Sequence, residues 1–345
     1  MAPPEGGLTR TILTCSPYFA DLALNEVRRC HPEANVLQHL APGYLLLQAP
    51  CSFEEFTYPW RHQLPIYLHH MFPVQRVVSL EGTLADLTCL RQAVHDIIPS
   101  SVAVQVRSAV ETELPYSVVQ VQRFLNEHQP TNTTLNPAGH VLSILIAQIK
   151  NEPRAYMGLS WASQNLSPWP GGQMPITEPV SNRAGYKLLE ALHAFAIRLR
   201  RGDHALDLGA APGAWTTLLR RRDLYVTAVA PTILYPWLML DSGVAYEPLL
   251  AEDYLNRCQT TFDLIVNDMK LDAQDSARLM VNYAQHLRRE GIAIMTLKLR
   301  MRNEQRVMDH AFRILRKAYK IIRVRQLVSN QQEVTLFLRR KPEGG

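Results

Sequence analysis

The chain has 345 residues, too many for one ordinary hydrophobic core, so we expect two or three domains. With 47% hydrophobic and 19% charged residues, the composition excludes global disorder. The formal net charge of +5 is compatible with a polyanionic partner, but a charge of this size does not establish one.

The cysteines and the N-terminus indicate a cellular compartment. The five cysteines form no C-x-x-C pair and their number is odd, which favours a reducing compartment over a disulfide framework or a zinc site. Residues 1–7 carry no basic segment followed by an apolar run, and no stretch approaches the 18 apolar residues of a membrane span. We therefore expect a cytoplasmic protein with no bound metal and no membrane partner.

The first half of the chain predicts small mixed units. We expect strands at residues 10–15, 34–39 and 44–48, with a helix at 17–30. Residues 50–73 are rich in proline and aromatic residues and read as a connector with few regular elements. Further strands are expected at residues 101–110, 141–149 and 154–161, with a helix at 117–127. This pattern predicts two α+β domains, residues 1–80 and 81–165.

A proline- and glycine-rich segment then marks a boundary. Four prolines and two adjacent glycines fall within residues 165–179, which excludes a helix or a central strand there, so we assign residues 166–179 to a linker. From residue 180 to 345, strands are expected at 205–208, 225–230, 264–268, 292–297, 320–325 and 333–338. Helices are expected at 180–200, 272–289 and 303–317. This alternation predicts an α/β, doubly wound, mostly parallel sheet, which binds ligands beyond the carboxyl ends of its strands.

A loop rich in small residues follows the first of these strands. It reads Asp207-Leu208-Gly209-Ala210-Ala211-Pro212-Gly213-Ala214-Trp215. The small residues let the backbone turn sharply and approach a ligand closely. A tight strand–helix turn without a ligand is one interpretation. A dinucleotide site is disfavoured because the G-x-G-x-x-G spacing is absent.

The same loop resembles the cofactor loop of the FtsJ-type RNA 2′-O-methyltransferases. The resemblance implies that S-adenosylmethionine is bound by Asp207, Gly209, Ala210, Ala211, Pro212, Gly213, Ala214 and Trp215, with Asp253 near the adenine and Asp268 also beside the cofactor. The chain departs from the pattern at Ala230, where the family carries an acidic residue for the ribose hydroxyls. Loss of such charge-assisted hydrogen bonds costs on the order of 1.5–3 kcal/mol each.

Four charged residues stand where apolar ones would be expected. Lys187 lies in a predicted helix, Asp268 and Lys298 end apolar strands, and Glu333 opens another strand. One polar residue at a strand terminus is commonly only solvated. The four together resemble the Lys-Asp-Lys-Glu tetrad of the FtsJ-type enzymes, in the same order and the same elements.

The tetrad fits the chemistry that the resemblance implies. A ribose hydroxyl is a poor nucleophile, so its proton must leave as its oxygen attacks the methyl group. By resemblance Lys298 is the base, and it must be neutral to accept a proton, which burial or a neighbouring cation such as Lys187 would favour. Asp268 and Glu333 would hold the amines, and Lys187 would orient the hydroxyl or stabilise the developing alkoxide. This chemistry needs no metal.

The N-terminal half is similar to another known region. Residues 101–161, with the Ser167-Pro168-Trp169-Pro170-Gly171-Gly172 segment that follows, resemble the THUMP domain and linker of the RlmM family of ribosomal RNA ribose methyltransferases. This implies that the N-terminal domains bind RNA. A role in packing or dimerisation alone is the other interpretation.

The charge pattern favours RNA as the partner. Between residues 287 and 325 the chain carries twelve basic and three acidic residues, and Arg339-Arg340-Lys341 follows near its end. Part of this is the solvated face of the helix at 303–317, but an excess beside the expected active site suits phosphate contacts.

The combined prediction is an S-adenosylmethionine-dependent RNA ribose 2′-O-methyltransferase acting on large-subunit ribosomal RNA. One alternative is the same chemistry on another structured RNA. A second is a catalytically silent RNA-binding protein of the same fold, suggested by Ala230.

Overall fold

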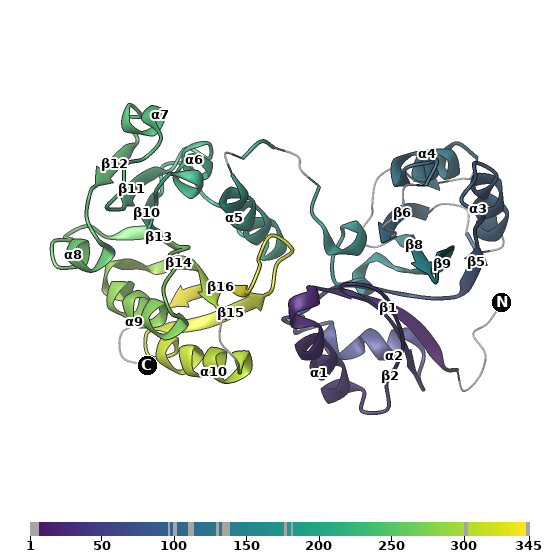
Figure 1. Cartoon of the computed structure of the whole chain (residues 1–345). Coiled ribbons are helices and arrows are strands. Elements are labelled where there is room, and N and C mark those ends of the chain that lie inside the picture. Colours follow the sequence, from purple (N-terminus) through teal and green to yellow (C-terminus); the bar gives the residue numbers. More distant parts are fainter. Residues whose placement is uncertain are drawn as a thin grey trace. The chain divides into compact units, whose positions relative to one another are not determined.

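The computed structural model describes residues 7–95, 97–98, 102–109, 114–128, 131–132, 139–175, 178–180, 182–299 and 303–342. The chain divides into two compact units, Met1–Pro175 and Ile176–Gly345 (Figure 1). The division falls inside the segment expected to be a linker. There, Gly172 has a φ of 79°, and a Cβ at this position would lie 2.7 Å from Cβ of His69, so both the backbone conformation and the close packing require glycine.

The N-terminal unit begins with a four-stranded antiparallel sheet of order β2-β3-β1-β4. Its elements are β1 (Thr9–Cys15), α1 (Ala20–Cys30), β2 (Asn35–Ala41), β3 (Tyr44–Ala49), α2 (Phe53–Thr57) and β4 (Leu68–Pro73), with 3-10 turns at Pro17–Phe19 and Tyr58–Trp60. The expectation of a connector with few regular elements at residues 50–73 is wrong. A capping box between Ser52 and Glu55 starts α2, and β4 is buried on both faces, so it shows no polar alternation.

The second sheet of this unit has the order β5-β9-β8-β6-β7 and mixes parallel and antiparallel pairs. Its elements are β5 (Arg76–Ser79), α3 (Asp86–His95), β6 (Val102–Ala109), α4 (Val118–His128), β7 (Thr131–Asn132), β8 (His140–Ile149) and β9 (Glu152–Trp161). Leu90 of α3 and Leu125 of α4 pack against Val104 and Ile144 of the sheet in one apolar core. Residues 101 and 110, the ends of one expected strand, lie outside the described residues. The predicted α+β character is confirmed, whereas the THUMP assignment and the boundary at residue 80 stay predictions.

The C-terminal unit alternates helices and strands. Its helices are α5 (Arg183–Ala194), α6 (Ala214–Arg220), α7 (Pro236–Met239), α8 (Ala251–Leu255), α9 (Ala273–Tyr283) and α10 (Glu304–Leu315). Its strands are β10 (His204–Leu208), β11 (Tyr225–Val229), β12 (Val244–Glu247), β13 (Phe262–Asn267), β14 (Leu287–Lys298), β15 (Tyr319–Arg325) and β16 (Glu333–Arg340).

These strands form one seven-stranded sheet of order β12-β11-β10-β13-β14-β16-β15, in which β16 runs in the direction opposite to the other six strands. Helices α5 and α6 lie beside one another on one side of the sheet, and α9 and α10 beside one another on the other (Figure 1). This arrangement confirms the predicted doubly wound, Rossmann-like fold. The strand order reverses between β10 and β13, which is where such sheets bind ligands.

Several elements of this unit differ from expectation. The helix expected at residues 272–289 ends at Tyr283, and residues 287–289 belong to β14 instead. The first helix is shorter than residues 180–200, because the Asn182 side chain caps it by accepting from the Ala184 N–H at 2.9 Å, and it stops before Ala196, whose φ is 53°. Strand β12 was not predicted, because an edge strand of four half-exposed residues carries too little periodicity to be read from sequence.

Candidate functional site at the carboxyl edge of the sheet

Charged side chains from neighbouring strands meet at the carboxyl edge of the seven-stranded sheet. Asp268 directly follows β13, and Lys298 is the last residue of β14. Glu333 opens the antiparallel strand β16 and is the register partner of Lys298, so the two side chains leave the sheet on the same face. Lys187 reaches the same point from α5.

Two amines and two carboxylates form one network. Nζ of Lys298 donates to Oδ1 of Asp268 at 2.7 Å, to Oε2 of Glu333 at 2.5 Å and to the Thr296 hydroxyl at 2.9 Å. Nζ of Lys187 lies 3.2 and 3.1 Å from the two Asp268 oxygens and 2.5 Å from Oε1 of Glu333. Each carboxylate therefore bridges both amines. The structure brings together all four residues of the Lys-Asp-Lys-Glu resemblance.

The network is buried and balanced in charge. The side chains of Lys298 and Glu333 are each 7% exposed, and those of Lys187 and Asp268 are 13% and 16% exposed. Two cations and two anions leave no net charge, which is the condition under which buried ions are tolerated. Burial lowers the pKa of Lys187, but the charges and hydrogen bonds of Asp268 and Glu333 outweigh burial and raise it overall. Lys187 is therefore held as a cation.

Lys298 is saturated by its partners. An ammonium group has three protons to donate, and the three oxygens around Nζ of Lys298 accept all of them. The Thr296 hydroxyl in turn donates to Asp268 at 2.6 Å. For Lys298 to accept a proton from a substrate, it must first lose one of its own, and the substrate must then take the place of one of these partners.

Two further residues, Glu190 and Asn330, hold the loop before Glu333, and neither was singled out from the sequence. Glu190 lies on α5 three residues after Lys187, is 3% exposed, and accepts hydrogen bonds from the backbone N–H groups of Val328 and Ser329 at 2.9 and 2.8 Å. In the same loop, the Asn330 amide donates to Glu333 at 3.4 Å, and its oxygen accepts from the Leu327 N–H at 2.9 Å. The helix that carries Lys187 therefore also fixes the loop before Glu333. The signal in the sequence was a lone carboxylate among the apolar residues 188–192.

The loop after β10 has the backbone geometry that its composition predicts. Gly209 and Gly213 have φ values of 73° and 113°, in the region that favours glycine. A Cβ on Gly209 would lie 2.3 Å from Cγ of Met269, and one on Gly213 would lie 2.2 Å from Cδ1 of Leu238. Both positions therefore need glycine for their backbone conformation and for packing.

Some residues of this loop reach the surface and others hold the loop in place. Gly209 and Pro212 are exposed and Ala211 is half-buried, whereas Ala210 and Ala214 are buried. The indole N–H of Trp215, also buried, donates to the carbonyl of Ala184 at 2.6 Å and so joins α6 to α5. A ligand can therefore contact Gly209, Ala211 and Pro212. The buried Ala210, Ala214 and Trp215 hold the loop against its neighbours.

Asp207 faces the protein rather than solvent. It is 2% exposed and accepts from the Thr216 hydroxyl at 2.7 Å. Burial raises the pKa of Asp207 to about 7; the Thr216 hydroxyl opposes this rise and the nearby charge of Asp268 adds to it. In this geometry Asp207 connects β10 to α6 beneath the loop.

The neighbouring strand ends differ in what they offer a ligand. Ala230 follows β11, is 2% exposed, and has no side-chain acceptor for ribose hydroxyls. Glu247 ends β12 in register with Val229, so a carboxylate stands one strand away from the position that Ala230 leaves apolar. Asp253 lies on α8, just beyond β12, and is exposed to solvent.

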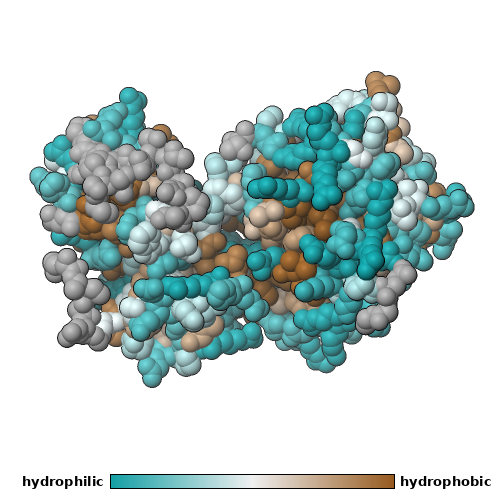
Figure 2. Space-filling model, turned by 180° about the vertical axis from the view of Figure 1, so that it is seen from behind, coloured by the Kyte–Doolittle hydropathy of each residue, from teal (hydrophilic) through white to brown (hydrophobic). Residues whose placement is uncertain are grey.

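The segment after Ala230 exposes an apolar surface that we did not predict. Ile233, Trp237 and Leu240 are 72%, 55% and 88% exposed, and apolar side chains are visible at the end of the unit that carries α7 (Figure 2). The Tyr235 N–H donates to the carbonyl of Pro212 at 2.9 Å, so this segment is attached to the loop after β10.

The expected basic excess beside the active site is wrong for most of its residues. Strands β14 and β15 begin at the amino edge of the sheet, and the antiparallel β16 ends there. That edge therefore carries the basic residues at 288–289, 316–320 and 339–341, at the end opposite to Lys298. Arg300 and Arg302 lie outside the described residues. Position along the chain did not reveal which end of a strand a residue occupies.

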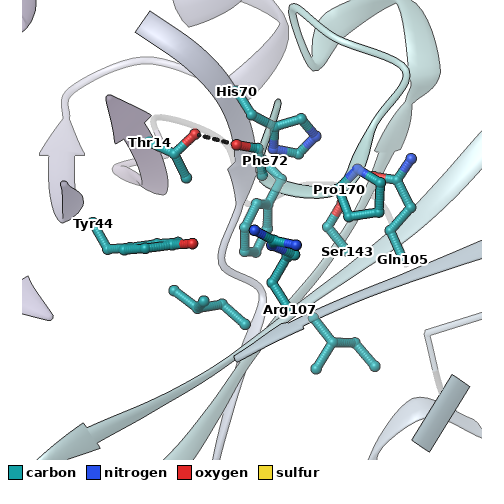
Figure 3. A pocket seen from close by; sticks show the side chains of 11 residues that line it. Thr14, Tyr44, His70, Phe72, Gln105, Arg107, Ser143 and Pro170 are labelled. Carbon is teal, nitrogen blue, oxygen red and sulfur yellow. Dashed lines mark hydrogen bonds between the residues drawn. The ribbon is translucent and has the colours of Figure 1, made fainter. Parts of the chain in front are cut away.

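The N-terminal unit contains a cavity between its two sheets, lined by both polar and apolar residues (Figure 3). Gln105 and Arg107 point into it from β6, Ser143 from β8 and His70 from β4. His70 is 1% exposed, and neither of its ring nitrogens lies in hydrogen-bonding geometry with a partner in the described part of the chain. Burial and then the charge of Arg107 lower the pKa of His70 to about 3, although the nearby Gln105 amide opposes this. His70 is therefore a neutral imidazole in the folded unit.

Among the described residues, no group of three or more His, Cys, Asp or Glu side chains is arranged to hold a metal ion. Within those same ranges, no helix combines the length and the apolar character that a bilayer span requires.

Comparison with known proteins agrees with this geometry. Residues 180–318 match the FtsJ-like methyltransferase family. The doubly wound sheet and the buried Lys-Asp-Lys-Glu network both lie within or directly beside this matched segment of the C-terminal unit.

The chain is also similar to curated proteins named ribosomal RNA large subunit methyltransferase M. The protein from Halorhodospira halophila is 38% identical over 181 residues, which cover 50% of this chain and 51% of the relative. That from Methylococcus capsulatus is 33% identical over 199 residues, covering 53% and 54%, and that from Azoarcus sp. is 33% identical over 198 residues, covering 52% and 53%. The chain thus spans about half the length of the curated relatives that it matches.

Proposed function

We propose that this chain transfers a methyl group from S-adenosylmethionine to a ribose 2′-hydroxyl of RNA. The buried network of Lys187, Asp268, Lys298 and Glu333 is the single observation that supports this most strongly. This network lies at the edge where doubly wound sheets bind ligands, and it would supply a base and a fixed cation there. A weak hydroxyl nucleophile needs both of these groups.

The loop from Asp207 to Trp215 would hold S-adenosylmethionine, whose positively charged sulfur carries a methyl group ready for transfer. Gly209 and Pro212 are exposed and Ala211 is half-buried, so a ligand at the switch point of the sheet would reach these three residues. Asp253 would contact the adenine. The apolar Ala230 leaves one hydrogen-bonding position of this site without an acceptor, so the ribose of the cofactor has fewer partners than in the family pattern.

The residues of the network would divide the work. Lys298 would accept the proton of the 2′-hydroxyl on its neutral Nζ, once that hydroxyl has displaced one of its partners. S-adenosylmethionine would supply the methyl group, whose bond to sulfur breaks as its bond to the ribose oxygen forms, so that the cofactor leaves as a neutral thioether. Lys187, held as a cation by Asp268 and Glu333, stabilises the negative charge that develops on that oxygen. Asp268 and Glu333 keep the two amines in place. Alignment of the reacting atoms supplies much of the rate.

Large-subunit ribosomal RNA is the proposed substrate. The support is the name shared by the curated relatives, together with the resemblance of the N-terminal half to a THUMP domain. The same chemistry on another structured RNA is the alternative within this class. A silent RNA-binding protein is the alternative outside it, since Ala230 weakens the cofactor site.

The decisive variant is Lys298→Ala. It should lower methyl transfer to RNA by about 100-fold or more, because general base catalysis contributes roughly 10²–10⁴-fold. The affinity for S-adenosylmethionine, measured by calorimetry, should stay within about threefold of that of the wild type. Lys270→Ala is the matched control, since Lys270 is an exposed lysine two residues after Asp268. Near-normal transfer by Lys298→Ala would show that Lys298 is not the base. Absence of both cofactor binding and transfer in the wild type would favour the silent protein.

A further inference from the structure

A basic surface lies at the amino edge of the methyltransferase sheet, away from the active site. It consists of the exposed residues Arg289, Lys317, Lys320, Arg339 and Lys341, which we call the amino-edge patch. These residues come together because β14 and β15 begin at this edge and β16 ends there. The Lys341 N–H donates to the carbonyl of Ala318 at 2.9 Å, which holds the last residues of the patch beside the start of β15.

The patch contains an unfavourable pair of like charges. Lys320 and Arg339 are direct register partners on β15 and β16, and like charges opposite one another destabilise a sheet. Among the described residues near the starts of β13 and β14, the acidic ones are Glu290 and Asp263, and Asp263 is engaged by Arg288 at 2.6 Å. These two acids of the described residues are fewer than the five basic residues of the patch. The C-terminus of α10 favours a cation at Lys317, but it gives no reason for the opposed pair on the strands.

We infer that the amino-edge patch binds the phosphate backbone of the RNA substrate, away from the target nucleotide. Phosphates satisfy an opposed Lys–Arg pair, since one anionic group between the two side chains removes their repulsion. Such contacts give affinity without base selectivity. This inference rests on the proposed function.

Geometry sets the length of RNA required. At about 3.3 Å per residue, the strand from Glu333 to Arg339 spans about 20 Å. A short oligonucleotide centred on the target can occupy the active site without reaching the patch. An RNA that reaches the patch must extend at least this far from the target ribose, as a folded domain of ribosomal RNA does.

The test compares two RNAs and two double variants of the full chain. The RNAs are a short oligonucleotide around the methylated position and a folded fragment several times longer. Lys320→Gln/Arg339→Gln neutralises the opposed pair. Arg257→Gln/Arg278→Gln removes the same charge from two exposed residues elsewhere in the same unit, one after α8 and one on α9. Binding is measured between 50 and 200 mM salt, and kcat is measured at saturating RNA.

The affinity for the long RNA falls as salt rises, so the slope of log affinity against log salt is negative. In the Lys320→Gln/Arg339→Gln variant the magnitude of this slope should be smaller by about 1–2. The ratio of wild-type to variant affinity should then shrink up to about tenfold between 50 and 200 mM salt. The short RNA, kcat and the Arg257→Gln/Arg278→Gln variant should be unaffected.

An unchanged slope for the long RNA would overturn the inference, as would an equal change for both RNAs. Loss of binding to phosphatidylserine vesicles with unchanged RNA binding would also overturn it, and would assign the patch to a lipid surface. If the wild type transfers no methyl group to either RNA, the proposed function itself fails, which is distinguishable from a failure of the patch alone.

Discussion

Glu190 connects the helix of Lys187 to the loop before Glu333, and a change of one atom in its side chain tests that connection. In Glu190→Gln an amide NH₂ replaces one of the two oxygens that accept from the Val328 and Ser329 N–H groups. A hydrogen bond to a charged group contributes about 1.5–3 kcal/mol, and a buried N–H left without an acceptor adds to the cost. We expect the free energy of unfolding to fall by about 2 kcal/mol.

The same change should reach the chemistry, because the loop carries Asn330, which donates to Glu333. If about 1.4 kcal/mol of the loss falls on the transition state, kcat drops about tenfold, with little change in the KM for either substrate. The assays are urea unfolding and steady-state methyl transfer.

Glu178→Gln is the matched control. Glu178 pairs with Arg222 at 2.6 Å at a partly exposed site, so its loss should cost less than about 1 kcal/mol and leave kcat unchanged. A destabilised Glu190→Gln protein with wild-type kcat would refute the argument, because it would show that the loop does not position Glu333.

Two further perturbations test the cofactor loop and the N-terminal unit. Gly213→Val should weaken S-adenosylmethionine binding by at least about tenfold, because the φ of 113° and the Leu238 side chain both disfavour a Cβ at this position. Affinity is measured by calorimetry, and an unchanged value would count against this loop as the cofactor site. The depressed pKa of His70, about 3 in the folded unit, means that the unfolded chain binds one more proton than the folded chain at pH values between about 6.5 and 3. The free energy of unfolding should therefore fall by about 1.4 kcal/mol per pH unit below pH 6.5, and His70→Phe should remove that share. Equal pH dependence of the wild type and His70→Phe in urea unfolding between pH 6.5 and 5 would contradict the assignment.

Most of the fold could be predicted from apolar strand patterns and local sequence motifs. The buried strands β10, β13 and β14 read as apolar runs, and the loop at Gly209–Gly213 follows from its small residues. Strand β4 and helix α2 were missed because burial on both faces, proline and aromatic residues hide the usual alternation. Helix α3 was also missed, although its buried residues Leu90, Ala93 and Val94 are apolar.

Site residues could be predicted from the sequence where each stands out individually, but the contacts between distant segments could not. Lys187, Asp268, Lys298 and Glu333 stood out as charges in apolar contexts, and the network that they form agrees with the tetrad resemblance. Glu190 and Asn330 act through a loop distant from α5 in sequence, so their pairing depends on tertiary structure. The basic excess was assigned to the wrong edge because strand direction within the sheet decides where a terminal residue lies.

The most direct test of the central claim is transfer of a labelled methyl group from S-adenosylmethionine to unmodified large-subunit ribosomal RNA, followed by alkaline hydrolysis. A 2′-O-methyl group blocks alkaline cleavage of the adjacent phosphodiester bond, so we predict label at one nucleotide together with one new alkali-resistant position. Both should be absent with Lys298→Ala. Label on a base without alkali resistance, or no label despite cofactor binding, would contradict ribose methylation as the function of this chain.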